Sequence, residues 1–441
     1  MGLVHGCVSE RDNLRLIYSM LIRCAAPIAF GIVLWRGFRD RGYWQGLGER
    51  FGFGPRLSRA GSIWLHAVSL GEMTAAAPLI RGIQARHPHV PLIVTTATPA
   101  GRARALHLFG GGADIRYLPY DTPGSVRRFF TRTKPKLAVI LETELWPNLF
   151  ERCRIDRIPL LLVNARLSSK SVSRYQRLDR IFGGLVRNLF SEKVFVAAQS
   201  VGDVERFRAI GVPEVQSAVV GNIKFDLHVD AELESLGHSV RRSFGACQDG
   251  SPRPVWIAGS THAGEDEQLL AAHAAVLAKI PETLLLLAPR HKDRFPAVAT
   301  LIERCGFSFV RRSTGAAPAA AGSVVLVDTL GELSMLYAAA DVAFVGGSLV
   351  PIGGHNLLEP AALGIPVLTG PSQSNSKEVA QALLQCGAAL EVADTQALES
   401  ALLSLLGNAA ERRRIGTLAK ELIAANRGSV NRLLELLDTR L

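Results

Sequence analysis

The stretch DVAFVGGSLVPIGGHNLLEPAALGIPVLTGP, from Asp341 to Pro371, predicts a strand, a glycine-rich loop, a helix start and a second strand. The apolar run at 342–345 is typical of a strand buried in a parallel sheet, and 366–368 predicts the next strand. The glycine pairs at 346–347 and 353–354 allow tight turns and a close approach of the backbone to a ligand. Ligands of open α/β sheets bind at such strand–loop–helix junctions.

Asn356 and Glu359 follow these glycines, where the helix is expected to begin. The free N–H groups of a helix start suit a phosphate, and a carboxylate one turn further suits the two hydroxyls of a ribose. This pattern predicts a nucleotide cradle. The alternative is a capping arrangement, with Asn356 as the N-cap and Glu359 reaching back to it. The local pattern leaves both interpretations open.

The rest of the chain alternates strands and helices in two similar halves. In each half the first strand leads into a Ser…Gly-Glu turn, at Ser69–Glu72 and at Ser260–Glu265. We therefore expect two doubly wound α/β domains, joined near residues 226–253. A last amphipathic run, 411–437, can pack back across the junction. The predicted strands are 62–68, 92–96, 137–141, 160–163, 194–198, 255–258, 284–288, 324–327, 342–345 and 367–368.

Residues 14–35 are the membrane-like segment of the sequence, with about the length of a spanning helix. Arg23 and Pro27 interrupt the segment, so a single-pass anchor and a helix lying in the membrane interface both stay open. The alternative is a buried helix of a soluble protein, and the flanking arginines favour membrane attachment over it. Three arginines follow it, which places the main body on the cytoplasmic side by the positive-inside rule. No small-residue cleavage site is evident, which indicates an anchor and not a removed signal peptide.

The net charge of +11 suits an anionic partner, such as membrane lipid, nucleic acid or a phosphorylated substrate. The sequence contains no basic–aromatic nucleic-acid module, so we do not expect nucleic acid as a partner. The six cysteines are scattered without a Cys-x-x-Cys pair, which favours reduced thiols in a cytoplasmic protein. No Asp-x-Asp or His-rich cluster suggests a metal site.

Carboxylates follow two strands of the first half. Glu72 begins the first helix, where the dipole favours its ionised form and suits a general base; the alternative is an ordinary first-turn glutamate. Glu142 and Glu144 end another strand, where a carboxylate can stabilise an oxocarbenium-like state, although Glu144 can instead hold a structural hydrogen bond. Lys224 lies where the two halves join and can balance a carboxylate or a departing phosphate. The alternative is a surface lysine.

Strand ends of the second half carry phosphate-binding residue types. Arg290, after Pro289, offers a planar fork for phosphate or base edges. Gly259 and Ser260 can donate N–H groups to phosphate. Another Gly-Glu turn, Gly331-Glu332-Leu333, follows the predicted strand at 324–327.

Together the segments SLGEMTAAAPL at 69–79, ETELWPN at 142–148, G-x-x-K-F-D at 221–226 and the quoted stretch resemble the 3-deoxy-D-manno-octulosonic acid (Kdo) transferases. These are lipid A glycosyltransferases with the GT-B fold. The resemblance implies that Glu72 is the catalytic base, that Glu142 and Lys224 stabilise the transition state, and that 164–168 lines the acceptor site. It also implies a cytidine-monophosphate site made of Gly259, Ser260, Pro289, Arg290, Gly331, Glu332, Leu333, Asn356, Leu357, Leu358 and Glu359.

The implied architecture is α/β, with two Rossmann-like domains facing a central cleft and an N-terminal membrane-anchor helix. Residues 1–41 would be an extension and anchor, 42–225 the acceptor domain and 226–441 the nucleotide-sugar donor domain. The implied reaction is inverting transfer of Kdo from CMP-Kdo to lipid IVA, without a metal or other cofactor, on the cytoplasmic side of the inner membrane.

Two other classes of protein fit parts of the pattern. A UDP-sugar epimerase shares the GT-B fold, and retention of CMP on a nucleotide panel would separate it from a Kdo transferase. A membrane-recruited basic binding protein would use the positive surface without catalysis, and turnover of CMP-Kdo would separate that class.

Overall fold

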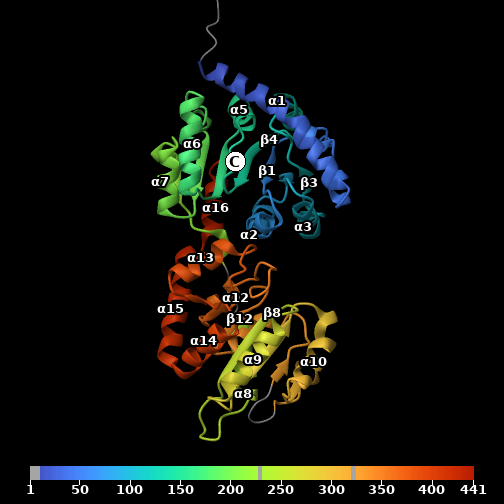
Figure 1. Ribbon diagram of the computed structural model, residues 1–441. Helices are drawn as coiled ribbons and strands as arrows, with labels where there is room; N and C mark the ends of the chain where they lie inside the picture. Colours follow the sequence, from blue (N-terminus) through green and yellow to red (C-terminus); the bar gives the residue numbers. More distant parts are fainter. Residues whose placement is uncertain (1–9, 227–230, 319–323) are drawn as a thin grey trace, which may run out of the picture. The chain divides into compact units, whose positions relative to one another are not determined.

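The chain folds into two compact units (Figure 1). The computed structural model describes residues 10–226, 231–318 and 324–441. The first unit runs to Asp226 and also takes in Gly428–Leu441, whereas the second unit is Leu227–Arg427. The predicted N-terminal extension falls mostly on residues 1–9, which lie outside the described residues.

The first unit is built on a parallel sheet that, among the described residues, has seven strands in the order β3-β2-β1-β4-β5-β6-β7. Helices on both sides connect successive strands. The elements are β1 Ser62–His66, α2 Leu70–Arg86, β2 Leu92–Thr96, α3 Pro99–Phe109, β3 Asp114–Tyr117, α4 Pro123–Thr133, β4 Pro135–Leu141, α5 Pro147–Ile155, β5 Leu160–Ala165, α6 Ser169–Ile181, β6 Val194–Ala198, α7 Val201–Ala209 and β7 Ser217–Val219.

Side chains of the central strands alternate between two cores. Trp64 and Ile140 point into a core shared with α4, α5 and α7, whereas Ile63 and Val139 point into a core shared with α2 and α3. Because successive strand residues face opposite sides of a sheet, continuous apolar runs such as 137–141 are required when both faces are covered.

The second unit repeats this design. In its described residues the strand order is β10-β11-β9-β8-β12-β13-β14, with all pairings parallel. Its elements are α8 Ala231–Ser243, β8 Val255–Thr261, α9 Asp266–Leu277, β9 Leu284–Pro289, α10 Phe295–Arg304, β10 Phe309–Arg311, β11 Val324–Leu326, α11 Leu333–Ala338, β12 Val342–Val345, α12 Leu358–Ala362, β13 Val367–Thr369, α13 Lys377–Gln385, β14 Ala389–Glu391, α14 Thr395–Gly407 and α15 Ala409–Asn426.

The C-terminal amphipathic run is two helices and not one. Helix α15 ends at Asn426, and Gly428, with φ of +75°, turns the chain before α16 begins (Ser429–Asp438). Helix α16 joins the first unit and buries Leu433, Leu434 and Leu437 in the core against α2. Gly82 of α2 makes room for this packing, because a Cβ there would lie 2.5 Å from Leu434 Cδ1.

Helix α1 (Glu10–Gly37) has the length and composition of a membrane span, with mean hydropathy 1.9 over Leu16–Gly37. One side of it contacts the first unit. The Tyr18 hydroxyl donates to Asp121 Oδ2 at 2.9 Å, the Ser19 hydroxyl donates to Asn148 Oδ1 at 2.8 Å, and the Phe30 ring packs edge-on against another aromatic ring of the unit. These large apolar side chains of α1 are exposed: Leu16, Ile17, Met20, Leu21, Ile28, Ile32, Leu34 and Trp35.

Candidate active site

The predicted site residues gather at the two points where strand order reverses. In the first unit β1 and β4 are neighbours, and the chain proceeds in opposite directions across the sheet from them. In the second unit β8 and β12 have the same relation. Ligands of doubly wound sheets bind beyond the carboxyl ends of the strands at such switch points. Glu72 and Glu142 follow β1 and β4, and Ser260 and the glycine-rich loop lie at the ends of β8 and β12.

Glu72 is a capping residue with an unusual environment. Its carboxylate accepts hydrogen bonds from the Val68 amide at 2.8 Å and the Ser69 hydroxyl at 3.0 Å, while Ser69 caps α2. Burial raises the pKa of Glu72 to about 7; the nearby charges of Glu142 and Glu144 add to the rise, and the two hydrogen bonds oppose it. A carboxylate with a pKa near neutrality is suited to general base catalysis. The position of an ordinary first-turn glutamate and the role of a general base are therefore compatible.

Glu142 and Lys224, which are 82 positions apart in the sequence, form an ion pair of 3.1 Å between Oε1 and Nζ. Each side chain is about a fifth exposed, so solvent can still reach the pair. Asn164 at the end of β5 accepts a hydrogen bond from the Ile223 amide at 3.1 Å, and this bond anchors the turn that carries Lys224. Lys224 thus has a carboxylate partner in this structure.

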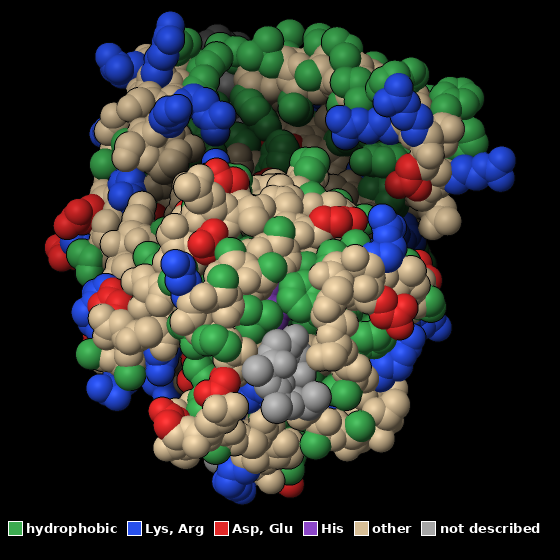
Figure 2. All heavy atoms as spheres, turned by 60° about the horizontal axis from the view of Figure 1, so that its bottom comes forward, with side chains coloured by type: hydrophobic (Ala, Val, Ile, Leu, Met, Phe, Trp, Pro, Cys, Tyr) green, Lys and Arg blue, Asp and Glu red, His purple; other side chains and the backbone are tan. Residues whose placement is uncertain are grey.

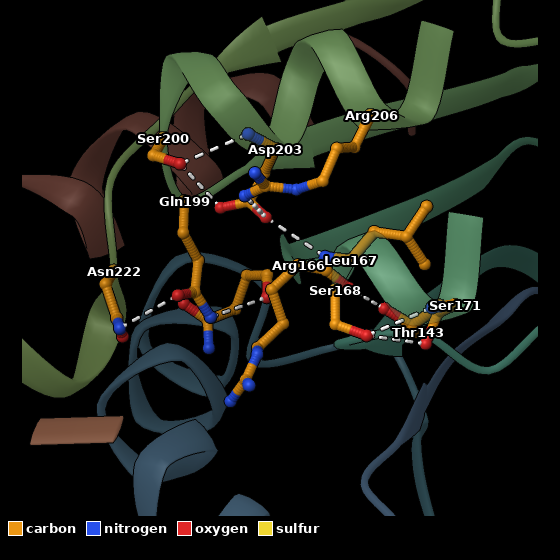
Figure 3. Close-up of polar contacts among 11 residues, drawn as sticks. Thr143, Arg166, Leu167, Ser168, Ser171, Gln199, Ser200, Asp203, Arg206 and Asn222 are labelled. Atoms are coloured by element: carbon orange, nitrogen blue, oxygen red, sulfur yellow. Dashed lines mark hydrogen bonds and ion pairs between the residues drawn. The ribbon is translucent and has the colours of Figure 1, made fainter. Parts of the chain in front are cut away.

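The segment 164–168 is held by the network shown in Figure 3. Asp203 accepts from the Leu167 amide at 3.0 Å and from Arg206 at 2.8 Å. The Thr143 hydroxyl donates to the Arg166 carbonyl, which links this segment to the residue after Glu142. The Arg166 side chain extends away from these contacts. The network thus fixes the backbone of Arg166 and leaves its guanidinium directed elsewhere.

Glu144 has the structural role that the sequence left open. The indole Nε1 of Trp146 donates to Glu144 Oε2 at 2.7 Å. Burial raises the pKa of Glu144; the hydrogen bond from Trp146 lowers it, and the charge of Glu142 raises it. The structural hydrogen bond predicted as the alternative for Glu144 is confirmed.

In the second unit, glycines allow two strand ends to approach each other. A Cβ on Gly346 would lie 2.6 Å from the Ser260 carbonyl oxygen, and a Cβ on Gly259 would lie 2.2 Å from the Tyr337 hydroxyl. Ser260 itself has φ of +59° at a register shift between β8 and β9. Gly259 is therefore needed for packing, whatever it contacts in a ligand.

Glu265 shapes the glycine-rich loop, and the sequence did not single it out as a site residue. It is fully buried and accepts hydrogen bonds from the amides of Gly347 at 2.7 Å, Ser348 at 2.9 Å and Leu349 at 2.9 Å. The repeated Ser…Gly-Glu turn was the available signal, since Glu265 occupies in the second unit the place of Glu72 in the first. The two glutamates differ because backbone amides occupy both oxygens of Glu265.

Asn356 and Glu359 lie together as predicted, but the helix beside them is short. Helix α12 has five residues and begins at Leu358, so its dipole offers less to a phosphate than the sequence suggested. Both carboxylate oxygens of Glu359 accept a hydrogen bond, one from Asn356 Nδ2 at 3.0 Å and the other from the Ser334 hydroxyl at 2.9 Å. Asn356 also accepts from the Leu358 amide at 3.1 Å, as a capping residue would. The pair combines capping with a pre-oriented carboxylate.

The other predicted nucleotide residues lie on neighbouring strand ends of the same sheet. Pro289 is the buried last residue of β9, and Arg290 follows it with an exposed side chain. Burial lowers the pKa of His355 in the glycine-rich loop to about 4, and the positive charge of Arg290 adds to this effect. Glu332 accepts from Arg312 at 3.2 Å, between Gly331 and the start of α11 at Leu333.

Cysteines and metal ligands add nothing to this arrangement. The five cysteines within the described ranges are free thiols. Among the residues described, no group of three or more His, Cys, Asp or Glu could hold a metal ion.

Residues 45–227 match the family model described as 3-deoxy-D-manno-octulosonic-acid transferase (kdotransferase). The chain is 41% identical over 426 residues to the 3-deoxy-D-manno-octulosonic acid transferase of Haemophilus influenzae, covering 96% of this chain and 98% of that one. It is 36% identical over 447 residues to the enzyme of the same name from Bordetella pertussis, covering 96% and 99%.

A solved structure agrees with the fold. The chain resembles Acinetobacter baumannii MurG with a TM-score of 0.53 at 12% identity, over 86% of this chain and 100% of that chain. It is also similar at 29% identity to the C-terminal CMP-Kdo binding domain of WaaA from Acinetobacter baumannii, covering 44% of this chain and 99% of that domain with a TM-score of 0.41. The predicted GT-B architecture of two doubly wound α/β units is confirmed.

Proposed function

Because this chain belongs to the Kdo transferase family of glycosyltransferases, we propose that it moves Kdo from CMP-Kdo to lipid IVA with inversion at the anomeric carbon. The observation that carries the proposal is the arrangement at the first switch point. Glu72, with a pKa raised to about 7, lies at the end of β1, and the Glu142–Lys224 ion pair lies at the end of β4.

In this proposal Glu72 takes the proton from the sugar hydroxyl of the acceptor. The hydroxyl oxygen forms the new bond to the anomeric carbon, while the bond from that carbon to the phosphate oxygen breaks and CMP leaves with the electron pair. Glu142 stabilises the positive charge that develops on the sugar ring, and Lys224 balances negative charge on the donor. Cytidylate is a good leaving group, so orientation and charge placement supply most of what the protein must add.

The second unit binds the donor nucleotide. Arg290 offers a planar fork for phosphate, and Glu359, already oriented by Asn356 and Ser334, offers a carboxylate to ribose hydroxyls. The loop at 346–354 approaches the nucleotide through backbone N–H groups, with Gly259 and Ser260 on the neighbouring strand. We expect no metal ion to take part.

The first unit attaches to the inner membrane from the cytoplasmic side through α1. Contacts to Asp121, Asn148 and Phe51 hold α1 on the first unit, and its exposed apolar side chains would lie in the membrane interface. The net charge of +11 adds attraction to anionic lipids. In Figure 2 hydrophobic side chains gather along the upper edge of the view.

The test is to incubate the purified full chain with CMP-Kdo and lipid IVA and to weigh the lipid product by mass spectrometry. The expected product is heavier than lipid IVA by one or more Kdo residues, and CMP appears in matching amount. Omitting lipid IVA and replacing CMP-Kdo by a UDP-sugar are the controls. Unchanged lipid mass with both substrates present would overturn the proposal.

A further inference from the structure

The first unit contains an apolar cavity of about 320 Å³. Helix α1 contributes Leu21 and Ala25 to its wall, the segment after β4 contributes Trp146, and α6 with the residues after it contributes Leu178, Phe182 and Leu185. All of its lining residues are aliphatic or aromatic. Its volume falls in the range of small-molecule sites, roughly 300–1,000 Å³.

One end of this cavity lies beside the candidate active site. The Trp146 ring that lines the cavity donates its N–H to Glu144 at 2.7 Å, two residues after Glu142. Tyr175 of α6 lines the same wall; burial raises the pKa of its hydroxyl, and the nearby Glu144 charge contributes to the rise. A ligand in the cavity would therefore end close to the segment that we assign to the chemistry.

Another part of the wall continues onto the exposed apolar surface. Leu21 lines the cavity and is also 56% exposed, and Ile181, next to Phe182, is 62% exposed. Figure 1 shows α1 crossing the end of the first unit that carries α5 and α6. Leu21 thus belongs both to the cavity wall and to the exposed apolar surface of α1.

We propose that this cavity receives one hydrocarbon chain of the acceptor lipid and thereby positions its sugar head for reaction. The inference rests on the proposed function, because only a lipid acceptor brings such a chain. A hydrocarbon chain fits the observations because the walls carry no charged side chain, and the polar groups of Tyr18 and Trp146 are already bonded to Asp121 and Glu144. The cavity also connects the two places that such a lipid must reach, the membrane side of α1 and the loop of Glu144.

The test fills the cavity from α1. Ala25 lines it and is exposed on the helix, so Ala25→Trp should place a large ring in the cavity without disturbing the sheet cores. Cys24→Trp is the matched control, because Cys24 is exposed on the same helix and is not among the lining residues. Flotation with vesicles of phosphatidylethanolamine and phosphatidylglycerol checks that both variants associate with membranes equally.

Kdo transfer is then measured with lipid IVA and with the same disaccharide stripped of its acyl chains. Losing a few methylene contacts should raise the KM for lipid IVA about tenfold in Ala25→Trp, with little change in kcat. The KM for the stripped acceptor should be the same in the parent and in both variants. Equal KM values for lipid IVA in Ala25→Trp and Cys24→Trp would overturn the acyl-chain site while leaving the transferase intact.

A second readout does not depend on turnover. The full chain is irradiated with a diazirine-bearing palmitic acid, and the labelled peptides are mapped. Labelling of α1 and 175–189 in the parent and its loss in Ala25→Trp supports the site even if no Kdo is transferred. Labelling that is equal in the parent and Ala25→Trp overturns it.

Discussion

Three residues that are not glycine hold a left-handed backbone at strand ends near the candidate site. Glu142, Asn164 and Ser260 have φ of +56°, +53° and +59°. Such conformations cost roughly 1–3 kcal/mol each and persist where the surrounding structure enforces them, often at functional sites. Register shifts at Asn164 and Ser260 accompany the strain. The residues with a left-handed backbone therefore lie at the same strand ends as the sequence motifs.

Glu72→Gln should keep the size of the side chain and most of its hydrogen bonding but remove the proton acceptor. Turnover should fall by about two to four orders of magnitude, while CMP affinity stays close to that of the parent. Initial rates and calorimetry with CMP measure both. Glu144→Gln is the control, because Glu144 bonds to Trp146 and has no assigned part in proton transfer. A Glu72→Gln protein with near-parent turnover would remove Glu72 from the mechanism.

The raised pKa of Glu72 also predicts two pH effects of opposite sign. The base must be ionised, so kcat/KM should rise with pH and level off above about 7, and Glu72→Gln should lose this limb. The folded state binds the proton more tightly than the unfolded state. The stability from this site is therefore complete below pH 4.5 and declines as pH rises toward about 7. The melting temperature of the parent should therefore fall more than that of Glu72→Gln between pH 4.5 and about 7. An equal fall in both proteins would contradict the buried environment of Glu72.

Arg290→Ala and Glu359→Ala should weaken CMP binding about ten- to a hundredfold, since each removes a charge-assisted contact of about 1.5–3 kcal/mol. Lys292→Ala is a suitable control because it removes an exposed positive charge two residues from Arg290. Calorimetry measures the CMP affinity of the folded variants. Parent-like affinity in both Arg290→Ala and Glu359→Ala would show that the nucleotide cradle has been misplaced.

Motifs led to the site residues, but the sequence could not supply their partners. The ion pair of Glu142 with Lys224 joins residues that are 82 positions apart, and no local pattern encodes that contact. The sequence failed to identify Glu265 as a site residue for a different reason. Its Ser…Gly-Glu turn reads like that of Glu72, and only the path of the glycine-rich loop reveals that its oxygens are occupied by amides.

Strands were predictable where they are buried on both faces. Every central strand coincides with an apolar run found in the sequence. The four strands that were missed are β3, β7, β10 and β14, and these are the two edges of each sheet. Edge strands here have three or four residues and partly exposed side chains, so they lack the continuous apolar run that signals a buried strand.

Removing α1 by starting the chain near Gly42 should leave a folded protein. Among the residues that the structure describes, the apolar clusters on both faces of the first sheet contain none from α1. Loss of the helix therefore exposes polar partners such as Asp121 more than it exposes the core. Circular dichroism should show a cooperative melt, and flotation should show weaker vesicle association. Activity on detergent-dispersed acceptor should survive in part. A truncated chain that never folds would show that α1 belongs to the core.

The two units differ in how they are assembled from the sequence. The second unit is continuous from Leu227 to Arg427 and has its own clusters on both sheet faces. We expect residues 227–427 expressed alone to fold and to bind CMP with nearly the affinity of the full chain, as measured by calorimetry. A fragment that folds but binds CMP more than about tenfold more weakly would place part of the nucleotide site in the first unit.

The return of α16 to the first sheet has a consequence for how the protein is made. The ribosome delivers most of the first unit early, yet Leu433, Leu434 and Leu437, which cover α2, emerge only after the whole second unit. During synthesis the apolar face of α2 therefore stays exposed to solvent while the second unit is translated, and the second unit can already fold in that time. The nascent chain should therefore recruit chaperones at α2, and a C-terminal fusion that hinders α16 should lower the yield of the N-terminal half.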